Sequence, residues 1–96
     1  MIFEAYVPVT SGGRSAPESL FHRAFKELKG EFGFVDTWPV YRQVEDTGTD
    51  VIEDEFYRYQ VDTSDTYSNR QWLLQWRMNQ EQQFLAPVWM IRYRLT

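Results

Sequence analysis

The sequence predicts an α+β domain of the ferredoxin-like plait type, in which two helices lie on one face of a four-stranded antiparallel sheet. Three observations favour this fold class. Segments with strand periodicity and segments with helix periodicity follow one another in the order β-α-β-β-α-β. Only a short polar turn separates the second strand from the third, which is typical of a hairpin. Right-handed crossovers between the other strands then give the strand order 4-1-3-2, with the first and third strands in the centre.

Length and composition indicate one domain that spans residues 1–96 and buries a modest core. Aromatic residues make up 18% of the chain, so we expect rings in the core and on at least one surface. The chain has no cysteine, which excludes disulfides and agrees with a cytoplasmic location. The net charge of −4 disfavours nonspecific nucleic-acid binding, and no apolar run is long enough to cross a membrane.

The first strand and the first helix are expected in the N-terminal third. The strand covers Ile2–Val7, and Pro8 ends it because proline cannot donate to a ladder. A glycine-containing loop, Thr10–Arg14, follows. The segment Ser15–Glu18 is a capping box with a proline in the first turn, which predicts a helix start. The helix is expected to stop at Gly30, after an apolar stripe made of Leu20, Phe21, Ala24, Phe25 and Leu28.

The second strand, expected at Phe34–Val44, contains Pro39 and is therefore placed at an edge of the sheet. The polar segment Glu45–Asp50 turns the chain back into the third strand. Carboxylates gather in and beside this turn, but their spacing fits no EF-hand loop. We expect a solvated hairpin tip with no metal and no cofactor. The carboxylates are Glu45, Asp46, Asp50, Glu53, Asp54 and Glu55.

The third strand, Val51–Asp62, alternates so that its two faces differ. Tyr57, Tyr59 and Val61 are expected to face the core beside Phe3, Ala5 and Val7 of the first strand. The other face then carries Asp54, Phe56, Arg58, Gln60 and Asp62. The alternative register buries Phe56 in place of the tyrosines, because a shift of one residue exchanges the faces.

The second helix is expected at Asn69–Phe84, with Ser68 and Gln71 as its capping box. Pro87 then opens the last strand. We expect its core-facing residues to be Trp89, Ile91, Tyr93 and Leu95. The opposite face then carries Val88, Met90, Arg92 and Arg94.

One stretch of the chain resembles a group of uncharacterised small bacterial proteins with a ferredoxin-like pattern. The residues that carry this resemblance are Phe32 and Gly33, Thr37, Trp38 and Pro39, Asp54 and Glu55, Tyr59 and Val61, and Asn79, Gln80 and Glu81. The chain departs from the pattern at Phe34, where a second glycine is expected. The resemblance implies the fold and carries no assigned activity, so it transfers no functional residue.

The face of the sheet that the helices leave open is the candidate binding surface. Exposed aromatic patches on small proteins usually mark a contact surface. We therefore expect a non-enzymatic interaction or regulatory module that forms a homodimer or binds a protein partner through this face. The residues expected to form it are Glu4, Tyr6, Asp54, Phe56, Arg58, Met90, Arg92 and Arg94.

Three other functions stay open at this stage, because a plait does not determine a function. A nucleic-acid binder of the RRM kind would stack bases on Tyr6 and Phe56, but the chain lacks the aromatic–glycine core of the RNP1 pattern. A small plait-type enzyme, either a metal-dependent nuclease or a small-molecule enzyme, could use Glu4 or Asp54 beside Arg58 as acid or base. An acidic inhibitor that mimics DNA would need carboxylates arrayed on one face.

Overall fold

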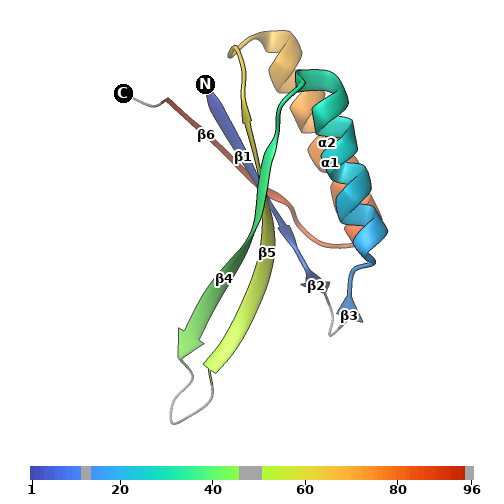
Figure 1. Cartoon of the computed structure of the whole chain (residues 1–96), viewed down its shortest axis with the longest axis vertical. Helices are drawn as coiled ribbons and strands as arrows, with labels where there is room; N and C mark the ends of the chain where they lie inside the picture. The colour runs from blue at the N-terminus through green and yellow to red at the C-terminus, as the bar shows by residue number, and fades with distance from the viewer. Residues whose placement is uncertain (12–13, 46–50, 95–96) are drawn as a thin grey trace.

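The computed structural model describes residues 1–11, 14–45 and 51–94, with the side chains of all of these except 11, 41–45 and 51–55. In chain order the elements are β1 (Ile2–Pro8), β2 (Thr10–Ser11), β3 (Arg14–Ser15), α1 (Glu18–Phe32), β4 (Asp36–Glu45), β5 (Val51–Asp62), α2 (Tyr67–Phe84) and β6 (Trp89–Tyr93). Figure 1 shows this path from blue at the N-terminus to red at the C-terminus.

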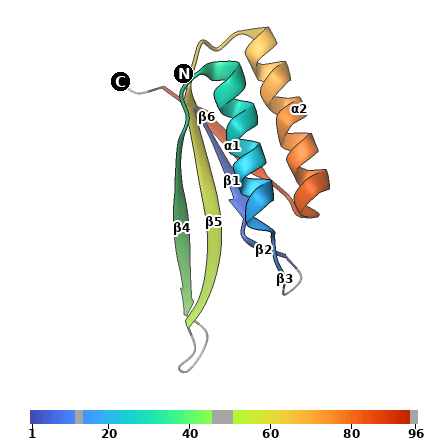
Figure 2. The same cartoon turned by 45° about the vertical axis from the view of Figure 1, so that its right-hand side comes forward.

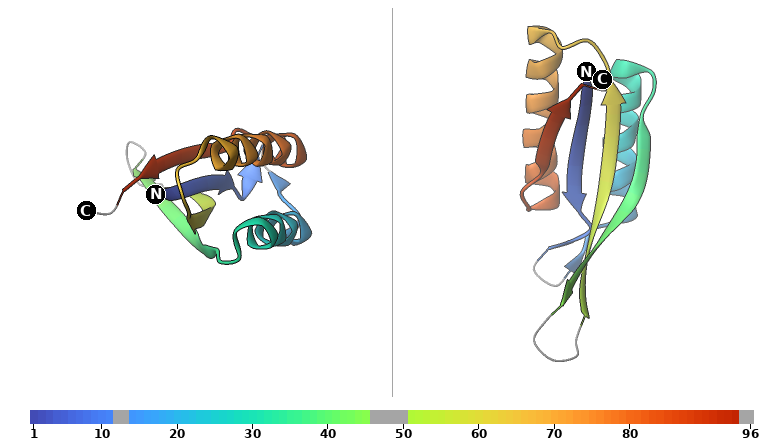
Figure 3. Two further views of the ribbon diagram at one scale, coloured as in Figure 1. Left: turned by 90° about the horizontal axis from the view of Figure 1, so that it is seen from above. Right: turned by 90° about the vertical axis from the view of Figure 1, so that its left-hand side faces the viewer.

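The structure confirms an α+β architecture with a four-stranded antiparallel sheet and two helices. The strands lie in the order β4-β5-β1-β6, and every neighbouring pair is antiparallel. Both helices cover the same face of this sheet, as Figure 2 and the left view of Figure 3 show. The proline-containing strand β4 lies at an edge of the sheet, as predicted. Pro39 has no N–H to donate, and an edge strand needs hydrogen bonds on one side only.

A small second sheet, β2-β3, forms where the sequence predicted a loop. Ser15 pairs with Thr10 in this sheet, and the N–H of Ala16 donates to the carbonyl of Val9 at 2.8 Å. Ser15 therefore does not cap the helix, and the predicted capping box is wrong. Helix α1 begins at Glu18 after Pro17, which has extended backbone and provides no side-chain cap.

The helix boundaries differ from the predicted ones in two further places. Helix α1 continues past Gly30 to Phe32, because Phe32 packs edge-on against Trp72 of α2 with ring centroids 5.2 Å apart. The helix ends at Gly33, whose φ of 84° suits glycine and whose N–H donates to Lys29. Helix α2 begins at Tyr67, two residues before the predicted start at Asn69.

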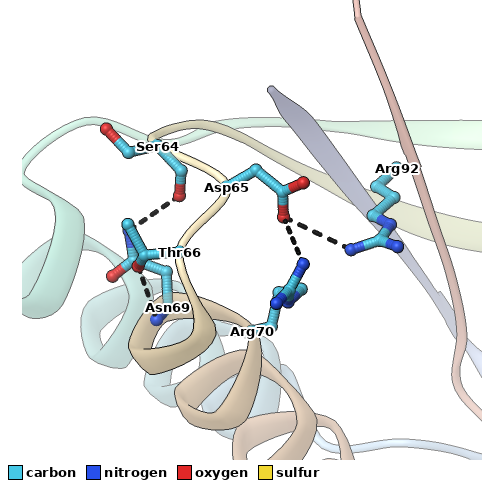
Figure 4. Close-up of polar contacts among 6 residues, drawn as sticks. All are labelled: Ser64, Asp65, Thr66, Asn69, Arg70 and Arg92. Carbon is cyan, nitrogen blue, oxygen red and sulfur yellow. Dashed lines mark hydrogen bonds and ion pairs between the residues drawn. The ribbon is translucent and has the colours of Figure 1, made fainter.

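The cap of α2 is Thr66 and not the predicted Ser68. The Thr66 hydroxyl accepts a hydrogen bond from the N–H of Asn69 at 3.1 Å. The side chain of Asn69 also donates to the carbonyl of Ser64 at 2.9 Å, so the turn before α2 is fixed from two sides (Figure 4).

The core lies between the helices and the covered face of the sheet. The predicted register of the third strand is confirmed, since Tyr59 and Val61 are each 2% exposed and pair with Ala5 and Phe3. Tyr57 is partly buried against the same core. The Tyr59 hydroxyl donates to the carbonyl of Phe21 at 2.9 Å, which satisfies the polar end of this buried ring. The helices contribute the buried residues Phe21, Ala24, Leu28, Leu73, Trp76 and Phe84.

The predicted faces of the last strand are wrong. Antiparallel partners share a face of the sheet, and Trp89, Ile91 and Tyr93 pair with Tyr6, Glu4 and Ile2 on the uncovered side. Met90 and Arg92 therefore lie on the helix side, where Met90 packs against the core. The reason is Val88, which is fully buried immediately before the strand and takes the core position. Because the core position is Val88 and not Trp89, every later residue of the strand lies on the face opposite to the predicted one. Leu95 lies outside the described residues.

Strands β4 and β5 are longer than their neighbours and form an extended hairpin (Figure 1). Strand β1 pairs with β5 only from Phe56 to Asp62, so from Val51 to Glu55 the strand pairs with β4 alone. The six predicted tip carboxylates lie outside the residues whose side chains are described, and their solvation stays a prediction. Among the described residues, no three potential ligands gather into a metal site. No helix there is long and apolar enough to cross a membrane.

Candidate functional site

The open face is the side of the four-stranded sheet turned away from both helices; the right view of Figure 3 looks onto it. All four strands contribute to it. Strand register places the following described side chains on this face: Ile2, Glu4, Tyr6 and Pro8 from β1, Asp36, Trp38 and Val40 from β4, Phe56, Arg58, Gln60 and Asp62 from β5, and Trp89, Ile91 and Tyr93 from β6. Two of these are well exposed although they are large and apolar, Trp89 at 57% and Ile91 at 49%.

The centre of the open face is the carboxylate of Glu4, which is only 4% exposed although no helix covers it. The hydroxyl of Tyr6 donates to Oε2 at 2.7 Å, and the amide of Gln60 donates to Oε1 at 3.2 Å. The hydroxyl of Tyr93 also donates to Oε1, and itself accepts from the Gln60 amide at 3.2 Å. Arg58 completes the set, with its Nη1 3.9 Å from Oε2. Three strands thus converge on one carboxylate.

These contacts decide the charge state of Glu4. Burial by itself raises the pKa of this carboxyl, but the hydrogen bonds from Tyr93 and Tyr6 and the charge of Arg58 outweigh it, so its pKa lies below the ordinary value. The hydrogen bond to Glu4 also raises the pKa of Tyr93. A carboxylate has about four lone-pair sites. Here Oε1 accepts two hydrogen bonds and Oε2 accepts one, while Arg58 contributes an ion pair at 3.9 Å. Most of the acceptor capacity of Glu4 is therefore used within the protein, which favours a structural role for an ionised carboxylate.

The rings around Glu4 are held in place by contacts of their own. The Arg58 guanidinium lies over the ring of Trp38, 3.7 Å from its centroid. Phe56 and Trp89 stack across the sheet with centroids 6.0 Å apart and 25° between their planes. Each of these rings thus has a neighbour within the open face, which favours a surface that is ordered before a partner binds.

The structure brings together four of the predicted site residues, namely Glu4, Tyr6, Phe56 and Arg58, all on the open face. Their part in binding stays a prediction.

The other four predicted residues do not join them. Met90 and Arg92 lie on the helix side, which corrects their predicted place, and Nη1 of Arg92 is 3.3 Å from Asp65. Arg94 follows the end of β6 and is exposed. The side chain of Asp54 lies outside the described part of the chain.

The predicted site left out other residues of this surface, among them Ile2, Val40, Gln60, Trp38, Trp89, Ile91 and Tyr93. For the last three, the signal was the apolar Val88 just before β6: if Val88 faces the core, then Trp89, Ile91 and Tyr93 alternate onto the open face. For Trp38, the signal was its position opposite Arg58 in the β4–β5 hairpin.

No known family model matches this chain, and no curated protein is significantly similar to it. A function for the chain is therefore inferred from the geometry of the open face.

Proposed function

We propose that the chain is a non-enzymatic interaction module that self-associates, with two copies pairing sheet to sheet through their open faces. The observation that carries this proposal is an ordered, uncovered aromatic surface on which Trp89 and Ile91 expose about half of their area, built over a carboxylate that is already satisfied. Exposed apolar patches of this kind on small proteins mark contact surfaces.

The charges of the open face favour a second copy as the partner. The chain carries a net charge of −4, so two copies repel each other unless they meet at a neutral surface. At the centre of the open face the charges of Glu4 and Arg58 cancel within the molecule. Near the strand ends, Asp62 lies 3.6 Å from the N-terminal amino group and Asp36 is exposed, so the neutral part of the face is its aromatic centre. A two-fold pairing brings the same patch against itself, which this neutral centre tolerates.

The same geometry argues against base stacking on this face. Arg58 occupies one face of Trp38, and Phe56 and Trp89 each turn one face toward the other ring, which reduces the ring area open to a base. Arg58 is the only cation among the described residues that we assign to the open face, and it is paired with Glu4. Phosphate binding depends on unneutralised Lys and Arg side chains. A nucleic-acid partner is therefore the weaker proposal.

We also propose that the fold is a ferredoxin-like plait and that the chain works in the cytoplasm. The four long strands, numbered in chain order as β1, β4, β5 and β6, support the order 4-1-3-2, with the β2-β3 hairpin as an addition outside the sheet. The absence of cysteine agrees with a reducing compartment.

Light scattering after gel filtration tests the proposed dimer. We expect the wild-type chain to be dimeric at about 100 μM, where association of micromolar affinity is nearly complete. Trp89→Lys places a charge on the exposed apolar part of the open face and is expected to give a monomer. Met78→Lys is the matched control, because Met78 is 47% exposed on α2 and the charge change is the same. A wild-type monomer mass, or equal behaviour of the two folded variants, would contradict the proposal.

A further inference from the structure

A second feature is a pocket between α2 and β6, which shares only Ile91 with the open face. Its volume is about 340 Å³, within the range of small-molecule sites. Three arginines line it: Arg70 and Arg77 stand two turns apart on α2, and Arg92 comes from β6. The rest of the wall is apolar and consists of Phe3, Leu73, Leu74, Met90 and Ile91.

The guanidinium groups of this arginine pocket are only partly neutralised. Arg70 and Arg92 share one carboxylate oxygen, Oδ1 of Asp65, at 3.4 Å and 3.3 Å. Figure 4 shows the two side chains reaching this oxygen from the helix and from the strand. No lining residue of the pocket is acidic.

The third guanidinium is paired less closely. Nε of Arg77 is 3.8 Å from Glu81, whose other carboxylate oxygen accepts the N–H of Val88 at 3.1 Å. This Nε atom is buried and has no hydrogen-bond partner among the described residues. Three positive groups thus meet two carboxylates, which leaves one positive charge in a chain whose net charge is −4.

We propose that the arginine pocket binds a small organic anion in which a carboxylate or phosphate group is joined to an apolar body. Guanidinium groups match the planar oxygens of these anions and bind them more strongly than neutral groups do. The apolar wall provides a place for a ring or a short alkyl chain, which inorganic anions lack.

The test is a calorimetric titration of the full chain with four probes: phenyl phosphate, benzoate, inorganic phosphate and benzyl alcohol. We expect one saturable site for at least one of the two aromatic anions. Inorganic phosphate, which lacks the ring, and benzyl alcohol, which lacks the charge, are expected to bind about ten-fold more weakly or worse. Tighter binding of phenyl phosphate assigns the site to phosphates, and tighter binding of benzoate assigns it to carboxylates.

Matched variants locate the binding site. Arg77→Gln and Arg92→Gln are each expected to weaken binding of the preferred anion about ten-fold, the usual effect of losing one charged hydrogen bond. Arg23→Gln, on the exposed surface of α1, makes the same charge change and is expected to have no effect. Two pocket variants are used because Arg92 is exposed and its loss leaves the core intact even if Arg77→Gln alters the fold. Absence of binding to both aromatic anions, equal binding of inorganic phosphate, or full affinity in a folded Arg92→Gln would overturn the proposal.

Discussion

Phe3 and Glu4 are neighbours on β1 and are buried to almost the same degree, 5% and 4% exposed, but on opposite faces of the sheet. Phe3 is buried because two helices cover its face with apolar side chains. Glu4 is buried because tyrosines, an amide and a guanidinium close over it within the sheet itself. Strand β1 thus has buried side chains on both sides, in an apolar environment on one face and in a polar environment on the other.

The two faces of the sheet stabilise the protein in different ways. Stability on the covered face scales with the apolar area removed from water, so it depends on volume and packing. Stability on the open face depends on the hydroxyls of Tyr6 and Tyr93 and the amide of Gln60 keeping Glu4 as their acceptor, because an unsatisfied buried polar group costs more than a hydrogen bond contributes. We therefore expect the covered face to fix the fold and the open face to fix an ordered surface for association.

The largest expected difference between the faces comes from removing one aromatic ring from each side of β5. Tyr59→Ala removes a ring from the core and should cost about 3–5 kcal/mol in the free energy of unfolding. Phe56→Ala removes a half-buried ring from the open face and should cost about 1 kcal/mol or less in the monomer. Chemical denaturation at low concentration measures both, with gel filtration to separate dimer dissociation from unfolding. The reverse order of the two costs would mean that the faces of β5 are misassigned.

Removing the carboxylate of Glu4 tests the polar interior. Glu4→Ala leaves the hydroxyls of Tyr6 and Tyr93 and the charge of Arg58 without their acceptor, and we expect a loss of about 2–3 kcal/mol. Glu31→Ala, which removes an exposed carboxylate on α1, is the matched control and should change stability by about 0.5 kcal/mol at most. A Glu4→Ala variant as stable as the control would show that the donors around Glu4 find water instead.

The pH dependence of stability should follow the same carboxylate. Because the pKa of folded Glu4 lies below its ordinary value of 4.5, the ionised form stabilises the fold above that pH. This contribution should be lost as the pH falls from 4.5 through the folded-state pKa. The stability difference between wild type and Glu4→Gln, measured by denaturant titration at pH 7 and at pH 3, should therefore shrink in acid. An unchanged difference would show that Glu4 is not the group that titrates.

The faces differ in how far the sequence could predict them. The alternation of β5 was enough to place Tyr59 and Phe56, since Tyr59 sits between polar neighbours of opposite orientation. The burial of Glu4 could not be predicted, because it depends on Gln60 and Tyr93, which are distant in sequence and meet Glu4 only across strands. The site was therefore recovered only in part.

The last strand and the helix starts failed for local physical reasons. One side of β6 carries Trp89, Ile91 and Tyr93, and the opposite side carries Met90 and Arg92. Either side has enough apolar surface to pack against a core. Val88, outside the strand, decides which side does so. Ser15 and Ser68 both match capping boxes, but Ser15 is taken by the β2-β3 hairpin and Thr66 caps α2 instead.

The smallest effect expected concerns the contact between Arg58 and Trp38. Arg58→Lys keeps the charge beside Glu4 but loses the planar contact with the ring, which should cost about 0.5–1 kcal/mol. Arg23→Lys on α1 is the control and should have no measurable effect on unfolding. Equal stability of the two variants would show that the ring contact adds nothing to the order of the open face.

Pairing through the open face is tested by a nuclear Overhauser experiment on a mixture of isotope-labelled and unlabelled chains, which detects only contacts between copies. We predict contacts from the ring of Trp89 and the methyl groups of Ile91 to side chains of the open face, and none from the outer surface of α1 or α2. Contacts between copies that involve the helices, or none at a concentration where the chain is dimeric, would contradict the claim that the open face is the surface of association.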